Sequence, residues 1–156
     1  MWSLKAYLWL LAVLTLSGLL LMLCYVPSAA TPASPAPSAG MSLGYVSRGV
    51  HFWAAQIAVL AVLAHLVRTI FAKTNRKRAG WALLLFLLTC LLCFTGYLLP
   101  WDQLASWMQQ ELLPHISAQN ALWSVYWTHT LVLSLLMLPF LLVYVRRTRR
   151  DLALPA

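Results

Sequence analysis

Two histidines on one apolar segment are the residues best suited to do chemistry. His51 and His65 are 14 positions apart, with Arg48 three residues before the first and Arg68 three residues after the second. At 100° per residue, 14 helical steps return to within ~40° of the same face, and the rings lie ~21 Å apart along the axis. Because ionisable side chains are costly inside a bilayer, they mark functional sites there. The spacing predicts two inward-facing imidazoles, one near each side of a membrane.

Four apolar stretches must position these rings. They cover residues 4–26, 50–72, 81–99 and 122–145 in a chain of 156 residues that is 62% hydrophobic. Each has about the ~20 residues that a membrane-spanning helix needs. The sequence therefore predicts an all-α fold, a polytopic membrane four-helix bundle that forms one domain over residues 1–156. It also predicts an external loop at 27–49, a basic turn at 73–80, an interfacial helix at 103–113 and a kink at Pro139.

The basic residues are concentrated where one side of such a bundle would lie. Nine of the eleven lie near the two termini or between the second and third spans: Lys5, Lys73, Arg76, Lys77, Arg78, Arg146, Arg147, Arg149 and Arg150. The positive-inside rule then places both termini in the cytoplasm of a bacterial-type inner membrane. Because topology and anionic lipids account for the net charge of +8, we expect no nucleic-acid partner. The first span resembles a signal peptide but is too long for one, so we expect it to stay uncleaved.

A second histidine can face His51 across the bundle. His129 lies about as far from the external end of the fourth stretch as His51 lies from the external end of the second. Two neutral imidazoles on separate rigid helices can ligate a haem iron from opposite sides. Gly18 and Gly96 lie at matching depth on the other two stretches, where a missing side chain would let a flat porphyrin approach the backbone. Arg48 is one turn from His51 and suits a haem propionate.

The motifs around these residues resemble cytochrome b. They are Gly-x-x-x-Arg-x-x-His at 44–51, His-Leu-Val-Arg at 65–68 and Gly-Tyr-x-Leu-Pro-Trp at 96–101. The resemblance is to the N-terminal, haem-binding half of bc-type quinol:cytochrome c oxidoreductases and covers about residues 17–147. It implies a bundle with two b haems, each ligated by one histidine from the second helix and one from the fourth.

Residue by residue, the resemblance implies a complete site for the external haem. His51 and His129 stand at its ligand positions, Gly18 and Gly96 at its packing glycines, and Arg48 at a propionate-binding position. A further arginine of the family is replaced here by Ser124, so we expect weaker propionate anchoring or anchoring by a partner.

The site for the second, cytoplasmic-side haem matches badly. Val143 and Tyr144 occupy the positions of its fourth-helix ligand, and Leu4 and Ala82 stand where the family has glycines. A bulky leucine in place of glycine obstructs a porphyrin sterically, so we expect one haem. A second haem near His65 would need five-coordinate iron, a Tyr144 ligand or a ligand from another subunit. The alternative is that His65 is a packing residue and that Arg68 extends to the interface.

The resemblance implies electron transfer between the quinone pool and an external redox partner, such as a cytochrome c or an iron–sulfur protein. We expect an electron-transfer subunit of a larger complex, with haem b and a quinone as its cofactors. The alternatives are a degenerate cytochrome b with a structural or assembly role, and a proton or ion pathway along His65 and Arg68. Cys90 and Cys93 lack the following histidine of a covalent haem motif and are expected to be core residues. His115 and Asp102 are expected to be solvated, and a proton-carrying role for Asp102 is the alternative.

Overall fold

The four predicted spans are present in the computed structural model, which describes residues 2–24, 41–72, 76–100, 103–112 and 114–153. Within these ranges every regular element is a helix. Four stretches are long and apolar enough to cross a membrane: Leu4–Leu23, Gly44–Phe71, Arg76–Leu98 and Ala118–Arg147. The all-α, four-span prediction is therefore confirmed.

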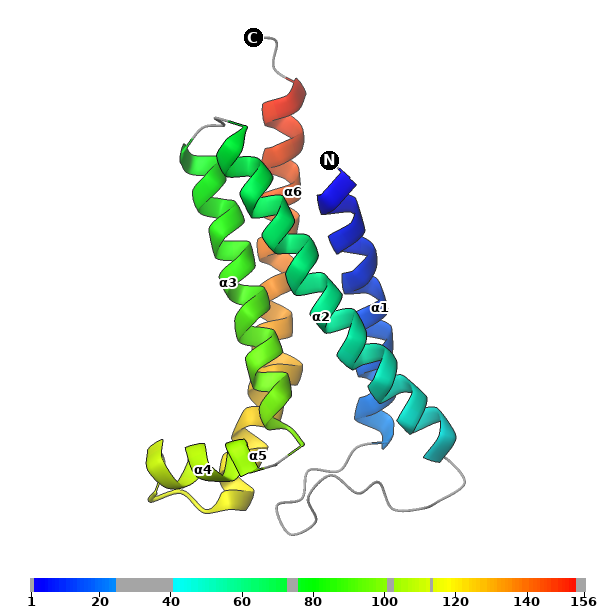
Figure 1. Ribbon diagram of the computed structural model, residues 1–156, viewed down its shortest axis with the longest axis vertical. Helices are drawn as coiled ribbons and strands as arrows, with labels where there is room; N and C mark the ends of the chain where they lie inside the picture. The colour runs from blue at the N-terminus through cyan, green and yellow to red at the C-terminus, as the bar shows by residue number, and fades with distance from the viewer. Residues whose placement is uncertain (1, 25–40, 73–75, 101–102, 113, 154–156) are drawn as a thin grey trace.

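The first three spans are single helices, and the fourth is a composite. The elements are α1 (Trp2–Cys24), α2 (Met41–Phe71), α3 (Arg76–Leu98), α4 (Gln103–Leu112), α5 (Ala118–Trp127), the π-helical segment η1 (Thr128–Leu133) and α6 (Ser134–Ala153). The α5, η1 and α6 segments follow one another without a break and form the fourth span. Figure 1 shows the spans running alongside one another, with both termini at one end and α4 lying across the other.

Two helices begin earlier than their hydropathy indicates. The α2 helix starts at Met41, so the prediction of a loop is wrong for residues 41–49, while 27–40 lie outside the described residues. The apolar run starts only at Val50, but a helix can extend beyond the apolar layer wherever its backbone hydrogen bonds continue. Likewise, α3 begins at Arg76, so the predicted turn at 73–80 is wrong for residues 76–80, while 73–75 lie outside the described residues. The chain stays helical through Pro139, and the π-helical segment η1 precedes it. The kink at Pro139 remains a prediction.

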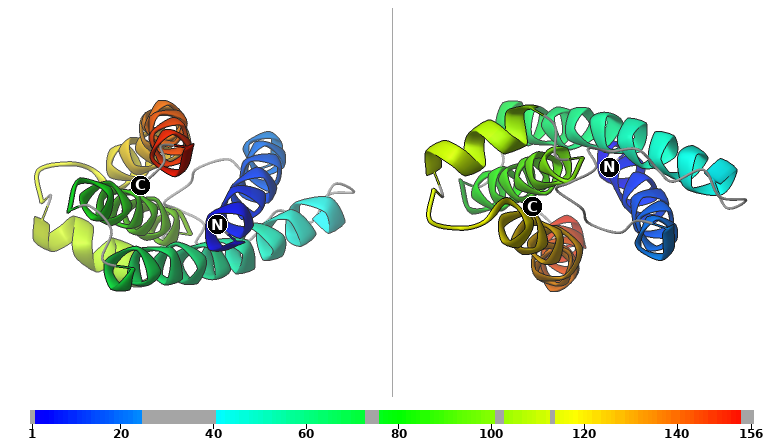
Figure 2. Two further views of the ribbon diagram at one scale, coloured as in Figure 1. Left: turned by 90° about the horizontal axis from the view of Figure 1, so that it is seen from above. Right: turned by 90° about the horizontal axis from the view of Figure 1, so that it is seen from below.

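The order of packing follows the order of the chain. The α1 helix packs along α2, α2 along α3, and α3 along η1 and α6. The views along the bundle in Figure 2 agree with this order: α3 lies between α2 and α6, and α1 lies on the same side of α2 as α6. The chain is thus two antiparallel helix pairs, α1 with α2 and α3 with the fourth span, joined where α2 meets α3.

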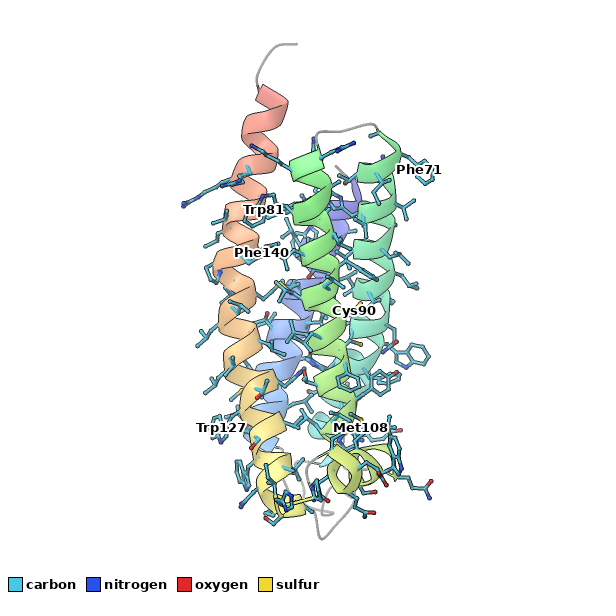
Figure 3. All side chains as sticks on the ribbon, turned by 90° about the vertical axis from the view of Figure 1, so that its left-hand side faces the viewer. Phe71, Trp81, Cys90, Met108, Trp127 and Phe140 are labelled. Atoms are coloured by element: carbon cyan, nitrogen blue, oxygen red, sulfur yellow. The ribbon has the colours of Figure 1, made fainter. Side chains whose placement is uncertain are left out.

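The buried apolar residues of the described part form two clusters at different depths. The larger lies toward the end that holds the termini and draws on all four spans: Leu4, Tyr7, Ala58, Val62, Leu66, Ala82, Leu85, Met137, Leu141 and Tyr144. The smaller lies where α3 ends and α4 and α5 begin: Leu98, Ala105, Ala121 and Leu122. Figure 3 labels Trp81 and Phe140, which lie side by side and pack against the larger cluster, and Met108, which packs against the smaller one. Between the two clusters lies the layer of His51 and His129.

Candidate functional site

The rings of His51 and His129 face each other between α2 and η1. Their centroids are 6.3 Å apart, and their planes are inclined by 75°. With a metal–imidazole bond of about 2 Å and a ring nitrogen about 1 Å from its ring centre, two imidazoles on opposite sides of one metal have centroids about 6 Å apart. An axial imidazole rotates about its bond to the metal, so the inclination is compatible with such a pair. Both rings are only half-buried.

The ring of His51 is hydrogen-bonded to two residues of α1. Its Nδ1 lies 3.1 Å from the backbone oxygen of Leu14 and 3.0 Å from Oγ of Ser17. A carbonyl oxygen can only accept, so Nδ1 carries the proton and donates it. In the neutral ring the lone pair is then on Nε2, the nitrogen left to bind a metal.

His129 is held in the same way by α3. Its Nδ1 lies 3.0 Å from Oγ1 of Thr95, and the ring also hydrogen-bonds the backbone of Leu92. The η1 segment that carries His129 is π-helical, and Oγ of Ser134 donates to the backbone oxygen of His129 over 3.0 Å. Single π-helical turns within α-helices are frequent at functional sites, where they redirect a side chain.

The two glycines lie against these rings. A Cβ built on Gly18 would be 3.2 Å from Cε1 of His51, and one on Gly96 would be 3.0 Å from Cε1 of His129. Both distances are shorter than an ordinary van der Waals contact, so each glycine makes room for the edge of an imidazole. From the sequence we expected these glycines to make room for a porphyrin. In the structure the neighbour is the ring itself.

The buried residues around the ring pair include small or polar ones, namely Ser17, Ala54 and Thr95. Leu133, one turn after His129, is buried there as well. Neither apolar cluster of the described residues includes a buried residue at this depth. Nor do the described ranges hold a group of three or more metal-ligating side chains. Two imidazoles suit an iron whose other four ligands come from a porphyrin, and the residues present fit haem b.

Arg48 and Ser124 lie toward the α4 end of the same site. Arg48 is exposed on α2, one turn before His51. Ser124 is also exposed, and its hydroxyl donates to the backbone oxygen of Asn120 on its own helix. Arg48 therefore remains the predicted propionate donor.

His65 lies in a different environment. It is 6% exposed, and its Nε2 is 2.5 Å from Oη of Tyr144. A metal between these atoms would require about 4 Å, from two bonds of about 2 Å. Leu4 and Ala82 belong to the surrounding apolar cluster, as their positions predicted. These residues do not fit a second haem, and the packing favours the alternative in which His65 is a core residue.

The other residues considered from the sequence stand apart from the ring pair. Arg68 and His115 are exposed. Cys90 and Cys93 are half-buried free thiols, and Nε2 of Gln56 donates to Sγ of Cys93 over 3.8 Å. Asp102 lies outside the described residues.

Sequence reasoning missed Ser17 and Thr95. A signal was available, because each directly precedes a glycine and lies 34 residues before the histidine that it contacts. The matching spacing of Ser17-Gly18 to His51 and of Thr95-Gly96 to His129 is a repeat across the two helix pairs, which hydropathy alone does not reveal.

Comparison with known proteins agrees with this geometry. The family model described as cytochrome b/b6/petB matches residues 1–132. A cytochrome b6 from Mesostigma viride is 29% identical over 134 residues, which cover 71% of this chain and 62% of the relative. A cytochrome b6 from Heliobacterium mobile is 36% identical over 100 residues, covering 58% of this chain and 46% of the relative. The menaquinol:cytochrome c reductase cytochrome b subunit of Geobacillus thermodenitrificans is 33% identical over 96 residues, covering 58% and 43%.

The chain therefore spans between about two fifths and three fifths of the length of these relatives. The family model covers well over half of the chain itself, including both histidines of the facing pair. The chain belongs to the cytochrome b/b6 family.

Proposed function

We propose that this chain is a membrane electron-transfer subunit that holds one b haem between His51 and His129. The observation that carries the proposal is the ring pair itself, 6.3 Å apart between centroids and hydrogen-bonded at Nδ1 on both sides. Bound haem would supply one-electron chemistry, and the chain would supply the ring nitrogens of the two histidines. Gly18 and Gly96 allow the two ligand rings to sit close to α1 and α3.

The proposal is for one haem rather than two. At the depth of His65 the interior is filled by side chains, and the largest fully buried ones include Tyr7, Tyr144 and Leu85. Oη of Tyr7 donates over 2.8 Å to Oγ1 of Thr89, whose own hydroxyl donates to the backbone of Leu85. Protein interiors packed in this way leave no room for a macrocycle. One haem alone does not form a relay across the membrane, so electrons would enter and leave near one face.

We place that face outside the cytoplasm. The bundle end that holds both termini also carries Arg76, Lys77, Arg78, Arg146 and Arg147. By the positive-inside rule this end is cytoplasmic in a bacterial-type inner membrane. The layer of His51 and His129 lies nearer the opposite end. The proposed partners are the quinone pool, an external cytochrome c or iron–sulfur protein, and other subunits of a membrane redox complex. One relative named above is a menaquinol:cytochrome c reductase subunit, which supports this choice.

The test is the haem content of the purified protein, measured as a pyridine haemochrome against protein concentration. We expect one haem per chain and a low-spin b-type spectrum that His129→Ala abolishes. A ratio of two would contradict the single-site proposal. A ratio of zero would favour the alternative of a degenerate cytochrome b with a structural or assembly role. An unchanged spectrum in His129→Ala would show that the ligand pair is wrong.

A further inference from the structure

The rings of His51 and His129 are each hydrogen-bonded to a side-chain hydroxyl of a neighbouring helix. Oγ of Ser17 on α1 lies 3.0 Å from Nδ1 of His51, and Oγ1 of Thr95 on α3 lies 3.0 Å from Nδ1 of His129. Both hydroxyl residues are buried, at 5% and 8% exposure. In both cases the hydroxyl residue lies 34 positions before its histidine, and the distance between the hydroxyl oxygen and Nδ1 is 3.0 Å. This duplication indicates a role at the ring pair itself.

The direction of these two hydrogen bonds follows from the other partners of the hydroxyls. The hydroxyl of Ser17 donates to the backbone oxygen of Val13 over 2.8 Å. The hydroxyl of Thr95 donates to the backbone oxygens of Leu91 and Leu92, each over 3.0 Å. A hydroxyl has one proton, so in both residues the oxygen is left to accept from the imidazole. Both rings are then Nδ1–H donors, and both keep the lone pair on Nε2.

We propose that Ser17 and Thr95 are positioning residues that accept hydrogen bonds from Nδ1–H of His51 and His129 and tune the potential of the iron between them. This inference rests on the proposed haem site. Accepting a hydrogen bond from Nδ1–H makes an imidazole a stronger donor through Nε2. A stronger donor stabilises ferric over ferrous iron and lowers the reduction potential. Losing either hydroxyl should therefore raise the potential, although the backbone oxygen of Leu14 still holds His51.

The first test needs no haem. The protein is labelled with ¹⁵N-histidine, purified without haem and placed in lipid nanodiscs. The signals are assigned from those lost in His51→Gln and His129→Gln. We expect a protonated Nδ1 and an unprotonated Nε2 in both rings, and a weaker Nδ1 hydrogen bond in Ser17→Ala and Thr95→Val. An Nε2–H tautomer in either ring of the unmodified protein would overturn the proposal.

The second test measures the midpoint potential of the haem-loaded protein. Ser17→Ala and Thr95→Val should each shift the ferric-to-ferrous equilibrium about threefold to tenfold toward ferrous, which is about 28–59 mV for a one-electron couple. Ser17→Thr and Thr95→Ser keep the hydroxyl and should restore the original potential. Thr15→Ala is the matched control, because its exposed hydroxyl donates only to Leu11 of its own helix.

The proposal is wrong if the double variant Ser17→Ala/Thr95→Val binds haem at the original ratio and has the same midpoint potential as Thr15→Ala. A protein that takes up no haem at all would instead refute the proposed function. In that case the Nδ1 hydrogen-bond strengths in Ser17→Ala and Thr95→Val still decide whether the hydroxyls position the rings.

Discussion

Gly96→Ala tests how closely the ring pair is packed. The added Cβ would lie 3.0 Å from Cε1 of His129, about 0.4 Å inside ordinary contact. The α3 backbone on one side and the His129 ring, which Thr95 holds, on the other leave little freedom to relax. The overlap should therefore cost about 1–3 kcal/mol, as overpacking of a filled interior does. If that cost falls on the haem-loaded state, the haem dissociation constant rises about 5- to 150-fold.

A helix-propensity effect of opposite sign must be separated from this cost. Alanine is favoured over glycine in a helix interior by about 1 kcal/mol. Gly80 lies on the same helix with no atom within 4 Å of its Cβ position, so Gly80→Ala measures that gain alone. At Gly18 the added Cβ would be 3.2 Å from His51, so Gly18→Ala should weaken haem binding less than Gly96→Ala.

The assay is haem titration into the haem-free protein in nanodiscs, followed by the Soret band, with thermal unfolding as a second readout. The expected order of haem affinity is Gly80→Ala equal to the original protein, then Gly18→Ala, then Gly96→Ala. The reasoning is refuted if Gly96→Ala and Gly80→Ala bind haem equally well.

Three further substitutions test the packed half of the bundle, and none of them should change the haem content. Tyr144→Phe leaves Nε2 of the buried His65 without its phenol and should destabilise the protein by about 1–3 kcal/mol; a midpoint within 0.5 °C of the original in thermal unfolding would contradict this. Tyr7→Phe should cost less, about 0.5–1.5 kcal/mol, because Thr89 keeps its bond to the Leu85 backbone; equal losses in the two tyrosine variants would disprove the comparison. Leu85→Ala opens a cavity at a fully buried position and should lower the free energy of unfolding by about 2–5 kcal/mol. Leu87→Ala, at an exposed position on the same helix, is the control. Similar unfolding midpoints for the two variants would refute the assignment of the core.

The parts of the fold that depend on composition could be predicted from the sequence, and the parts that depend on helix rotation could not. Hydropathy located the four spans, and matching depth predicted that His51 and His129 face each other. For His65 the sequence and the structure agree on its neighbours, since Leu4 and Ala82 both belong to the buried apolar cluster around it. Hydropathy placed the start of α2 too late, because the helix continues beyond the apolar layer to Met41.

The contacts of the rings were not predictable in the same way. Whether Ser17 reaches His51 depends on the rotation of α1 against α2 as well as on its place in the chain. The π-helical turn at His129 has no marker in the residues that form it, and the one proline of that span lies further on, at Pro139. Ligation of iron by the pair, propionate binding by Arg48 and the sidedness of the bundle remain predictions.

The duplicated arrangement of Ser17 with His51 and of Thr95 with His129 has a consequence for biogenesis. Each helix pair orients its own imidazole without help from the other pair. Membrane helices insert first and associate afterwards. Each helix pair can therefore orient its histidine as soon as its own two helices associate. A group bound between the rings of His51 and His129 would then add a further link between the two helix pairs, which also pack along α2 and α3.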